Sequence, residues 1–151
     1  MKLGNLVAAG ATTLGTAAAA LALAAPANAA PMVDACPALP GQQATTASCS
    51  ATSGPQGLAL AITAEGGQAT VTADGFAGPL AIAIGPGARV DAAGSNPGLA
   101  LGIAGAQSAV QFDGNSAPTC SGSAALAGDF QTLQGCAAVG GQFIPLDIIP
   151  R

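Results

Sequence analysis

Residues 58–114 contain one short pattern three times, with glycine and proline between the copies. In residues 58–62, 80–84 and 99–103, larger aliphatic residues alternate with alanine or glycine. Such alternation has the two-residue period of a β-strand. Helix-breaking sequences separate the runs: Gly66-Gly67, Gly78-Pro79, Gly85-Pro86-Gly87 and Asn96-Pro97-Gly98. They interrupt any helix before its third turn, so the pattern predicts strands although alanine and leucine favour helices.

Each run is followed by a turn and by a second short run, at residues 69–73, 88–92 and 108–112. Each unit then reaches a glycine, and Gly75, Gly94 and Gly114 recur at intervals of about 20 residues. The leading leucines of the units, Leu58, Leu80 and Leu99, recur at a similar interval. Such near-constant spacing indicates a repeated unit of two strands, with like residues at like positions.

Two architectures fit two strands in each unit of about 20 residues. In a parallel β-solenoid each unit is one coil, whereas in a small antiparallel β-sandwich the strands pair through hairpins. Stacking of coils accounts for the repeated side chains, so we expect an all-β fold, a short β-solenoid or β-roll of about three coils. The larger apolar side chains of the block are expected to be buried, and alanine methyls, backbone hydrogen bonds and both disulfides, or association of chains, must supply the rest of the stability. The alternating alanines fit either a tight interior or a flat outer face.

The four cysteines, Cys36, Cys49, Cys120 and Cys136, flank the repeat in pairs. An even number of cysteines in an exported chain predicts disulfides, and three pairings are possible. Spacing favours two local loops, Cys36 with Cys49 and Cys120 with Cys136. A zinc site is disfavoured because the chain has neither a CxxC pair nor a histidine.

The amino terminus predicts a secretory signal peptide. Lys2 precedes an apolar run that Pro26 ends, and Ala27, Ala29 and the following Ala30 form a small-x-small cleavage site. We expect cleavage after Ala29, and no membrane-spanning segment once it has occurred. The segments expected are thus a signal peptide (1–29), a disulfide-containing flank (30–57), the repeat block (58–114) and a second disulfide-containing flank with an apolar tail (115–151). The alternative interpretation of Cys36 is that it is acylated, as in a lipoprotein.

The run from Ala81 to Ala88 reads A-I-A-I-G-P-G-A, and it resembles the A-I-A-I-G-x-x-A repeat of trimeric autotransporter adhesin heads. Those heads are left-handed parallel β-rolls, so the resemblance implies a β-roll here. The repeats of this chain are longer, and therefore trimerisation and adhesion are not carried over. The signal peptide, four cysteines and Ala/Gly-rich middle are similar to small secreted proteins of mycobacteria and related actinobacteria. That likeness implies export and no particular activity.

Composition excludes several classes of function. The chain has 151 residues with three basic and seven acidic side chains, too few basic groups to bind the phosphates of a nucleic acid. Without histidine, and without lysine after cleavage, it lacks the usual bases of nucleophilic catalysis. A carboxylate pair is the remaining catalytic option, and Asp-Gly turns are the remaining calcium option. The acids concerned are Glu65, Asp74, Asp91 and Asp113. Because they are sparse and lie in turn-like contexts, we expect no enzyme, no cofactor and no metal.

The carboxyl-terminal segment 142–151 is apolar, and its two prolines make it extended. It is expected either to cover an open end of the core or to serve as a docking strip. The function expected is that of a small exported structural or interaction protein, at the cell envelope or outside it. Its partners would be envelope components or further copies of the chain. The alternative is a carrier that holds an apolar small molecule between the repeat block and the tail.

Overall fold

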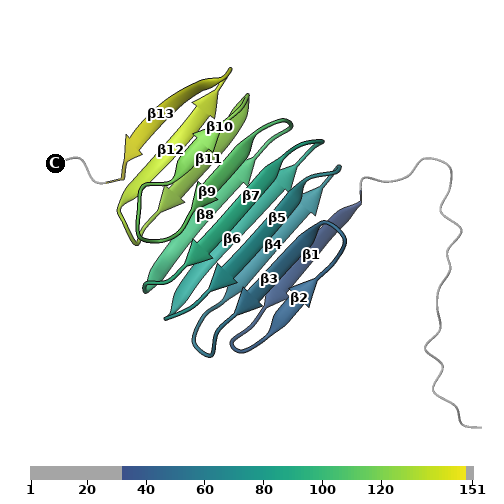
Figure 1. Cartoon of the computed structure of the whole chain (residues 1–151), viewed down its shortest axis with the longest axis vertical. Coiled ribbons are helices and arrows are strands. Elements are labelled where there is room, and N and C mark those ends of the chain that lie inside the picture. The colour runs from purple at the N-terminus through teal and green to yellow at the C-terminus, as the bar shows by residue number, and fades with distance from the viewer. Residues whose placement is uncertain (1–31, 149–151) are drawn as a thin grey trace, which may run out of the picture.

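The computed structural model describes residues 32–148, which form two stacked β-sheets (Figure 1). The predicted signal peptide, with its cleavage site at Ala27, Ala29 and Ala30, lies outside the described residues, and so do residues 149–151. Every regular element between residues 32 and 148 is a strand, as the sequence pattern predicts.

The larger sheet has seven strands. In spatial order these are β1 (Val33–Ala38), β4 (Ala59–Ala64), β6 (Ala77–Ile84), β8 (Gly98–Ala104), β11 (Ala124–Asp129), β12 (Gln134–Val139) and β13 (Gln142–Asp147). The smaller sheet has six strands, in the order β2 (Gln43–Thr45), β3 (Cys49–Ser53), β5 (Gln68–Ala73), β7 (Arg89–Gly94), β9 (Ala109–Phe112) and β10 (Thr119–Ser121).

The repeat forms a parallel β-solenoid, because the chain alternates between the two sheets from β3 to β9. Strands β4, β6 and β8 pair in parallel in one sheet, and β3, β5, β7 and β9 pair in parallel in the other. The predicted coils of two strands are therefore confirmed, and the antiparallel sandwich is wrong. Antiparallel strands enclose the solenoid, with β1 beside β4 and β11 beside β8.

The coils have a more regular period than the leading leucines suggest. Leu60, Leu80 and Leu101 are register partners, and their spacing along the chain is almost constant. The expected alignment of Leu58 with Leu80 is thus wrong by two residues. In the other sheet Val71 pairs with Ala92 rather than with a valine. A shift of two residues leaves every side chain on the same face of its strand, so alternation alone does not fix this register.

Alanines line the interior of the solenoid on the seven-stranded side, and the leucines and isoleucines point outward. Side chains such as Ala61 and Ala81 are fully buried, while their chain neighbours Leu60 and Leu80 are only partly buried. From the opposite sheet Val71, Val90 and Val110 fill the core. The expectation that the larger aliphatic residues form the core is therefore wrong for this sheet.

Short turns explain this inversion. Only three or four residues connect consecutive strands between β4 and β9: residues 65–67, 74–76, 85–88, 95–97 and 105–108. Turns of this length bring the two sheets close together. Alanine opposite valine fits such a gap, and leucine opposite valine would overfill it.

Gly102 shows how closely the interior is matched. It stands in the row of Ala61 and Ala81, opposite the larger side chain of Phe112. A Cβ atom at this glycine would lie 2.8 Å from Cε1 of Phe112 and 3.0 Å from Cγ1 of Val110. The smaller residue in one sheet thus compensates for the larger one in the other.

Two disulfides join the sheets at the two ends of the solenoid. Cys36–Cys49 connects β1 to β3, and Cys120–Cys136 connects β10 to β12. This is the pairing that spacing favours, and it leaves none of the four cysteines free. All four cysteines are buried, so the bridges close the ends of an interior that has few large side chains.

Candidate interaction surfaces

The outer surface of the seven-stranded sheet is apolar from one edge to the other. Its outward side chains are Val33, Ala35, Pro37, Leu60, Ile62, Ala64, Leu80, Ile82, Ile84, Leu99, Leu101, Ile103, Ala124, Leu126, Ala137, Val139, Gln142, Ile144 and Leu146, with glycines at 78, 128 and 135. We call these residues the apolar face. Gln142 is its single polar side chain, and none of its side chains is charged.

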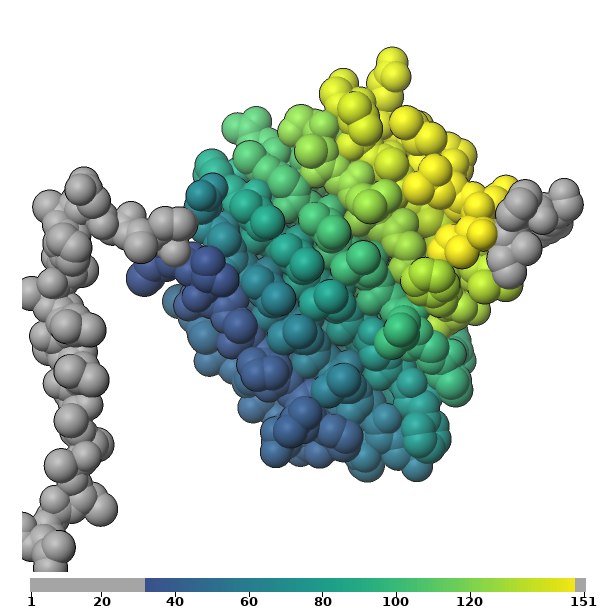
Figure 2. Space-filling model, turned by 180° about the vertical axis from the view of Figure 1, so that it is seen from behind, coloured from purple at the N-terminus to yellow at the C-terminus, as the bar shows by residue number. Residues whose placement is uncertain are grey.

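Register places the largest side chains of the apolar face in two rows across the strands. One row contains Leu60, Leu80 and Leu101, and the other contains Ile62, Ile82 and Ile103. Leu126 extends the second row, because it pairs with Ile103. In Figure 2 the strands follow one another as diagonal bands, from the purple of β1 to the yellow of β13. The rows therefore form two continuous ridges on a broad surface.

Exposed apolar residues continue the face at one end of the strands. Leu58, Phe76, Phe130 and Leu133, here called the apolar rim together with Leu99 of the apolar face, are, like Leu99, exposed, with exposed fractions from 45% to 66%. Backbone hydrogen bonds hold them together: Leu58 N donates to Ala77 O, Gly98 N to Phe76 O and Phe130 N to Leu99 O. Phe76 and Leu133 have φ of 65° and 59°. This left-handed region is unfavourable for bulky residues.

The six-stranded sheet presents a polar surface instead. Its outward side chains include Gln43, Thr45, Ser50, Thr52, Gln68, Thr70, Thr72, Arg89, Asp91, Gln111, Thr119 and Ser121. Nε of Arg89 lies 2.7 Å from Oδ2 of Asp91, and this exposed ion pair raises the pKa of the arginine. The molecule is therefore a slab with one polar and one apolar side.

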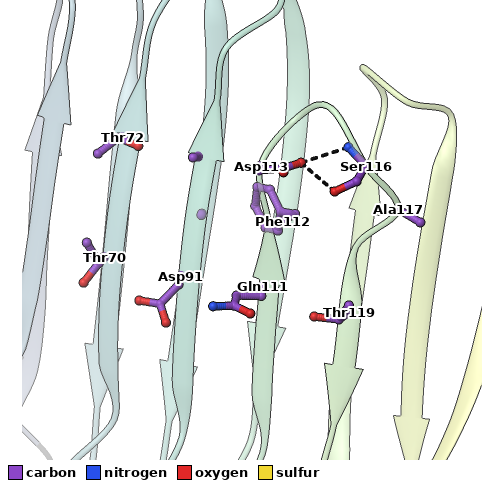
Figure 3. A pocket seen from close by; sticks show the side chains of 11 residues that line it. Thr70, Thr72, Asp91, Gln111, Phe112, Asp113, Ser116, Ala117 and Thr119 are labelled. Atoms are coloured by element: carbon purple, nitrogen blue, oxygen red, sulfur yellow. Dashed lines mark hydrogen bonds between the residues drawn. The ribbon is translucent and has the colours of Figure 1, made fainter.

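A shallow hollow of about 420 Å³ lies on the polar side (Figure 3). Strands β5, β7, β9 and β10 form its floor, and the loop after β9 forms one wall. Its lining side chains include Thr70, Thr72, Asp91, Gln111, Asp113, Ser116 and Thr119. The hollow is open, and its lining combines these polar groups with apolar surface from Ala92, Ala93, Phe112 and Ala117. It does not lie between the repeat block and the apolar tail, where the carrier hypothesis places a ligand.

Asp113 organises the wall of this hollow. Its Oδ1 accepts hydrogen bonds from the backbone N of Asn115 and from both N and Oγ of Ser116, each at 2.9 Å. These donors stabilise the charged carboxylate, so they lower the pKa of Asp113 below its ordinary value of 3.8. Asp113 is thus a loop-ordering group, as expected for an Asp-Gly turn.

The lowered pKa predicts how the loop responds to acid. The stabilisation from Asp113 is fully present above the ordinary value of 3.8, and it is lost as pH falls through the lowered pKa. We expect the carboxyl carbon of Asp113 to titrate below 3.8 in an NMR titration. In the variant Asp113→Asn, the amide protons of Asn115 and Ser116 should exchange with solvent faster at neutral pH. A titration midpoint at or above the ordinary value would contradict this account.

The four acids considered for catalysis or calcium binding are not gathered at one site. Glu65 lies in the turn between β4 and β5, and Asp74 lies in the turn between β5 and β6, at opposite ends of β5. Asp91 and Asp113 both line the hollow, each engaged by its own partners. Among residues 32–148, no three His, Cys, Asp or Glu side chains group in a way that could hold a metal ion.

Asp129 is a buried acid that sequence reasoning did not single out. Its side chain is fully buried, and Oδ1 accepts a hydrogen bond of 2.8 Å from Gln131 N. Its Oδ2 has no hydrogen-bond partner. Asp129 anchors the turn between β11 and β12 that carries Phe130 and Leu133. The alternation of β11 alone could have placed it inward.

The tail is extended as predicted, but it does not cover an end of the core. Strand β13 adds to the edge of the sheet beside β12, and each of its six residues is exposed. Phe143 on its inner side is 53% exposed. The expectation of a covering strap is therefore wrong, because β13 continues the sheet beyond the end of the opposite layer.

No family model, curated protein or solved structure matches the chain significantly. Functional inference therefore rests on the surfaces themselves. The two disulfides indicate an oxidising compartment outside the cytoplasm. In the described part of the chain, no helix is long and apolar enough to cross a bilayer.

Proposed function

We propose that the chain is a small exported structural or interaction protein that acts at the cell envelope or outside it through its apolar face. The observation that carries this proposal is the uncharged outer surface of the seven-stranded sheet. Monomeric soluble proteins rarely leave apolar patches larger than a few hundred Å² exposed, and larger patches mark interaction sites. The buried cysteine bridges and the amino-terminal Ala27, Ala29 and Ala30 pattern support export.

The export part of the proposal is tested by the intact mass of the protein from a secreting host, with and without reduction. We expect a chain of residues 30–151 that lacks four hydrogens, found in the medium or with the envelope and absent from the cytoplasm. A heavier species that begins at Cys36 would show a lipoprotein. An uncut, fully reduced chain in the cytoplasm would overturn export.

The interaction part is tested by adsorption of the oxidised protein to alkyl-coated beads, at dilution low enough that copies of the chain do not associate. We expect Ile103→Glu to reduce adsorption, because it places a charge at the centre of the apolar face. Thr52→Glu is the matched control, since it adds the same charge on the polar side. Equal adsorption of the two variants would contradict a role for the apolar face.

A further inference from the structure

We propose that a second copy of the chain covers the apolar face, so that two slabs pack face to face about a two-fold axis. This inference rests on the proposed function, since it names the partner of the surface described there. The other conceivable occupants are an unrelated protein and a lipid surface. Area, shape, charge and the apolar rim together favour the second copy.

The face has the area that a specific dimer requires. The seven strands lie about 4.8 Å apart, so the face measures about 29 Å across the strands. Three outward residues on each strand, within five residues that rise about 3.3 Å each, give about 17 Å along the strands. That is about 500 Å² in each copy, and the apolar rim adds one further outward position, about 6.6 Å long, over five strands, which raises it to about 650 Å². Two copies would together bury about 1,300 Å², within the range of about 1,200–2,000 Å² of specific complexes.

The relief of the face fits its own copy. The leucine and isoleucine rows lie two residues apart along β4, β6 and β8. The leucine row ends at Gly128, which pairs with Leu101, and the small residues Ala64 and Gly78 lie beside the rows. Aligned sheets pack by interdigitating the side chains of their facing surfaces, at about 10 Å between sheets. A two-fold axis near β8, the middle strand, would set the leucine and isoleucine rows of one copy against those of the other.

Charge favours a second copy over a lipid surface. Nothing on the apolar face is charged, so two copies approach without repulsion across the contact. Arg89 is the single basic residue among residues 32–148, and it lies on the opposite side in an ion pair with Asp91. Anionic lipid headgroups attract proteins through lysine and arginine beside the inserted face, and the described part of this slab has none there.

The apolar rim supports coverage by a partner. Phe76 and Leu133 occupy left-handed backbone conformations while their side chains are 63% and 45% exposed. In the isolated molecule this arrangement combines backbone strain with little burial. A second slab laid over the face would bury both side chains, and this would offset the strain.

The test is the sedimentation-equilibrium mass of the oxidised, exported chain at tens of micromolar. We expect twice the mass of one chain for the natural protein and for the control Thr52→Glu. We expect the mass of a single chain for Ile103→Glu, with unchanged far-ultraviolet circular dichroism. Two charges would then face each other at the centre of the contact without solvent.

A milder variant keeps the test decisive if Ile103→Glu does not fold. Ile103→Thr retains the β-branched shape and replaces apolar surface with a hydroxyl in both copies. It should raise the dissociation constant of the dimer by about tenfold or more. An unchanged dissociation constant in this variant, with Thr52→Glu as its reference, would overturn the proposal.

The outcomes separate this inference from the proposed function. A natural protein with the mass of one chain that adsorbs to alkyl-coated beads through the face overturns the dimer and leaves the interaction role intact. If the protein is a single chain and adsorbs no better than Ile103→Glu, both are wrong. A double mass that Ile103→Glu does not reduce shows a contact elsewhere and overturns the face-to-face arrangement.

Discussion

Replacing Ala81 by leucine is expected to destabilise the protein far more than replacing its neighbour Leu80 by alanine. Ala81 is fully buried, and Ala61 and Gly102 flank it in the same interior row. A leucine there would meet the opposite sheet across a gap that short turns keep narrow. Overfilling of this kind should destabilise by about 3 kcal/mol, the upper end of the usual cost. Leu80 points outward, so its truncation should cost about 1 kcal/mol.

Denaturant unfolding of the two variants measures this difference, at dilution low enough that association does not contribute. The usual ranking of residues by hydrophobicity predicts the reverse order, because it places leucine inside and alanine outside. If Leu80→Ala is the more destabilised variant, the assignment of the alanines to the interior is wrong. The pair is well matched, since the two positions are adjacent on β6 and pair with the same strands, β4 and β8.

Loss of both disulfides is expected to unfold the protein at ordinary temperature. The bridges close loops with sequence separations of 13 and 16 residues. Each should contribute about 3 kcal/mol through the unfolded state. Their sum of about 6 kcal/mol is comparable with the whole stability of a small domain, about 5–15 kcal/mol. An interior of alanine and valine supplies less hydrophobic free energy than a core of leucine and phenylalanine.

The measurement is thermal unfolding of the oxidised protein, of two double-serine variants and of the reduced protein. Cys36→Ser with Cys49→Ser opens one end of the solenoid, and Cys120→Ser with Cys136→Ser opens the other. We expect each pair to lower the melting temperature markedly and reduction to abolish the cooperative transition. A reduced protein that melts within a few degrees of the oxidised one would show that the interior is sufficient alone.

Much of the fold can be predicted from the sequence because glycine and proline mark the ends of the strands clearly. Glycine and proline at 66–67, 78–79 and 85–87 leave segments that are too short for helices, so their alternation is that of strands. Repetition then distinguishes the solenoid from a sandwich. The local cysteine pairing follows as well, because each pair lies just outside the repeat.

The sequence does not predict the strand register or which side of each strand faces the interior, and the reason is physical. Alternation has a period of two, so Leu58 and Leu60 are equally good partners for Leu80 until the ladder is seen. Alternation also separates two faces without saying which is inside. Here the distance between sheets decides the question, and that distance depends on turn length. A tight turn selects the small side chain at Ala81 for the interior.

The sequence alone does not reveal the candidate surface, for the same reason. Counting the leucines and isoleucines as buried leaves no surface to consider. A useful signal was nevertheless present. Phe76 follows Asp74-Gly75 at a turn position where a small or polar residue is usual. A bulky apolar residue at such a position is expected to lie at the surface, as Phe76 does.

The nearly constant coil length, about 20 residues in each unit, makes the solenoid modular. Each coil contacts its two neighbours only, so a duplicated coil between β4 and β8 would lengthen the slab and leave both disulfide-closed ends intact. Every added coil would widen the apolar surface by one strand, or about 4.8 Å. Duplication of one coil within the gene can thus increase the area of the apolar surface, and with it the affinity for a partner, in small steps. The types of residue on that surface need not change.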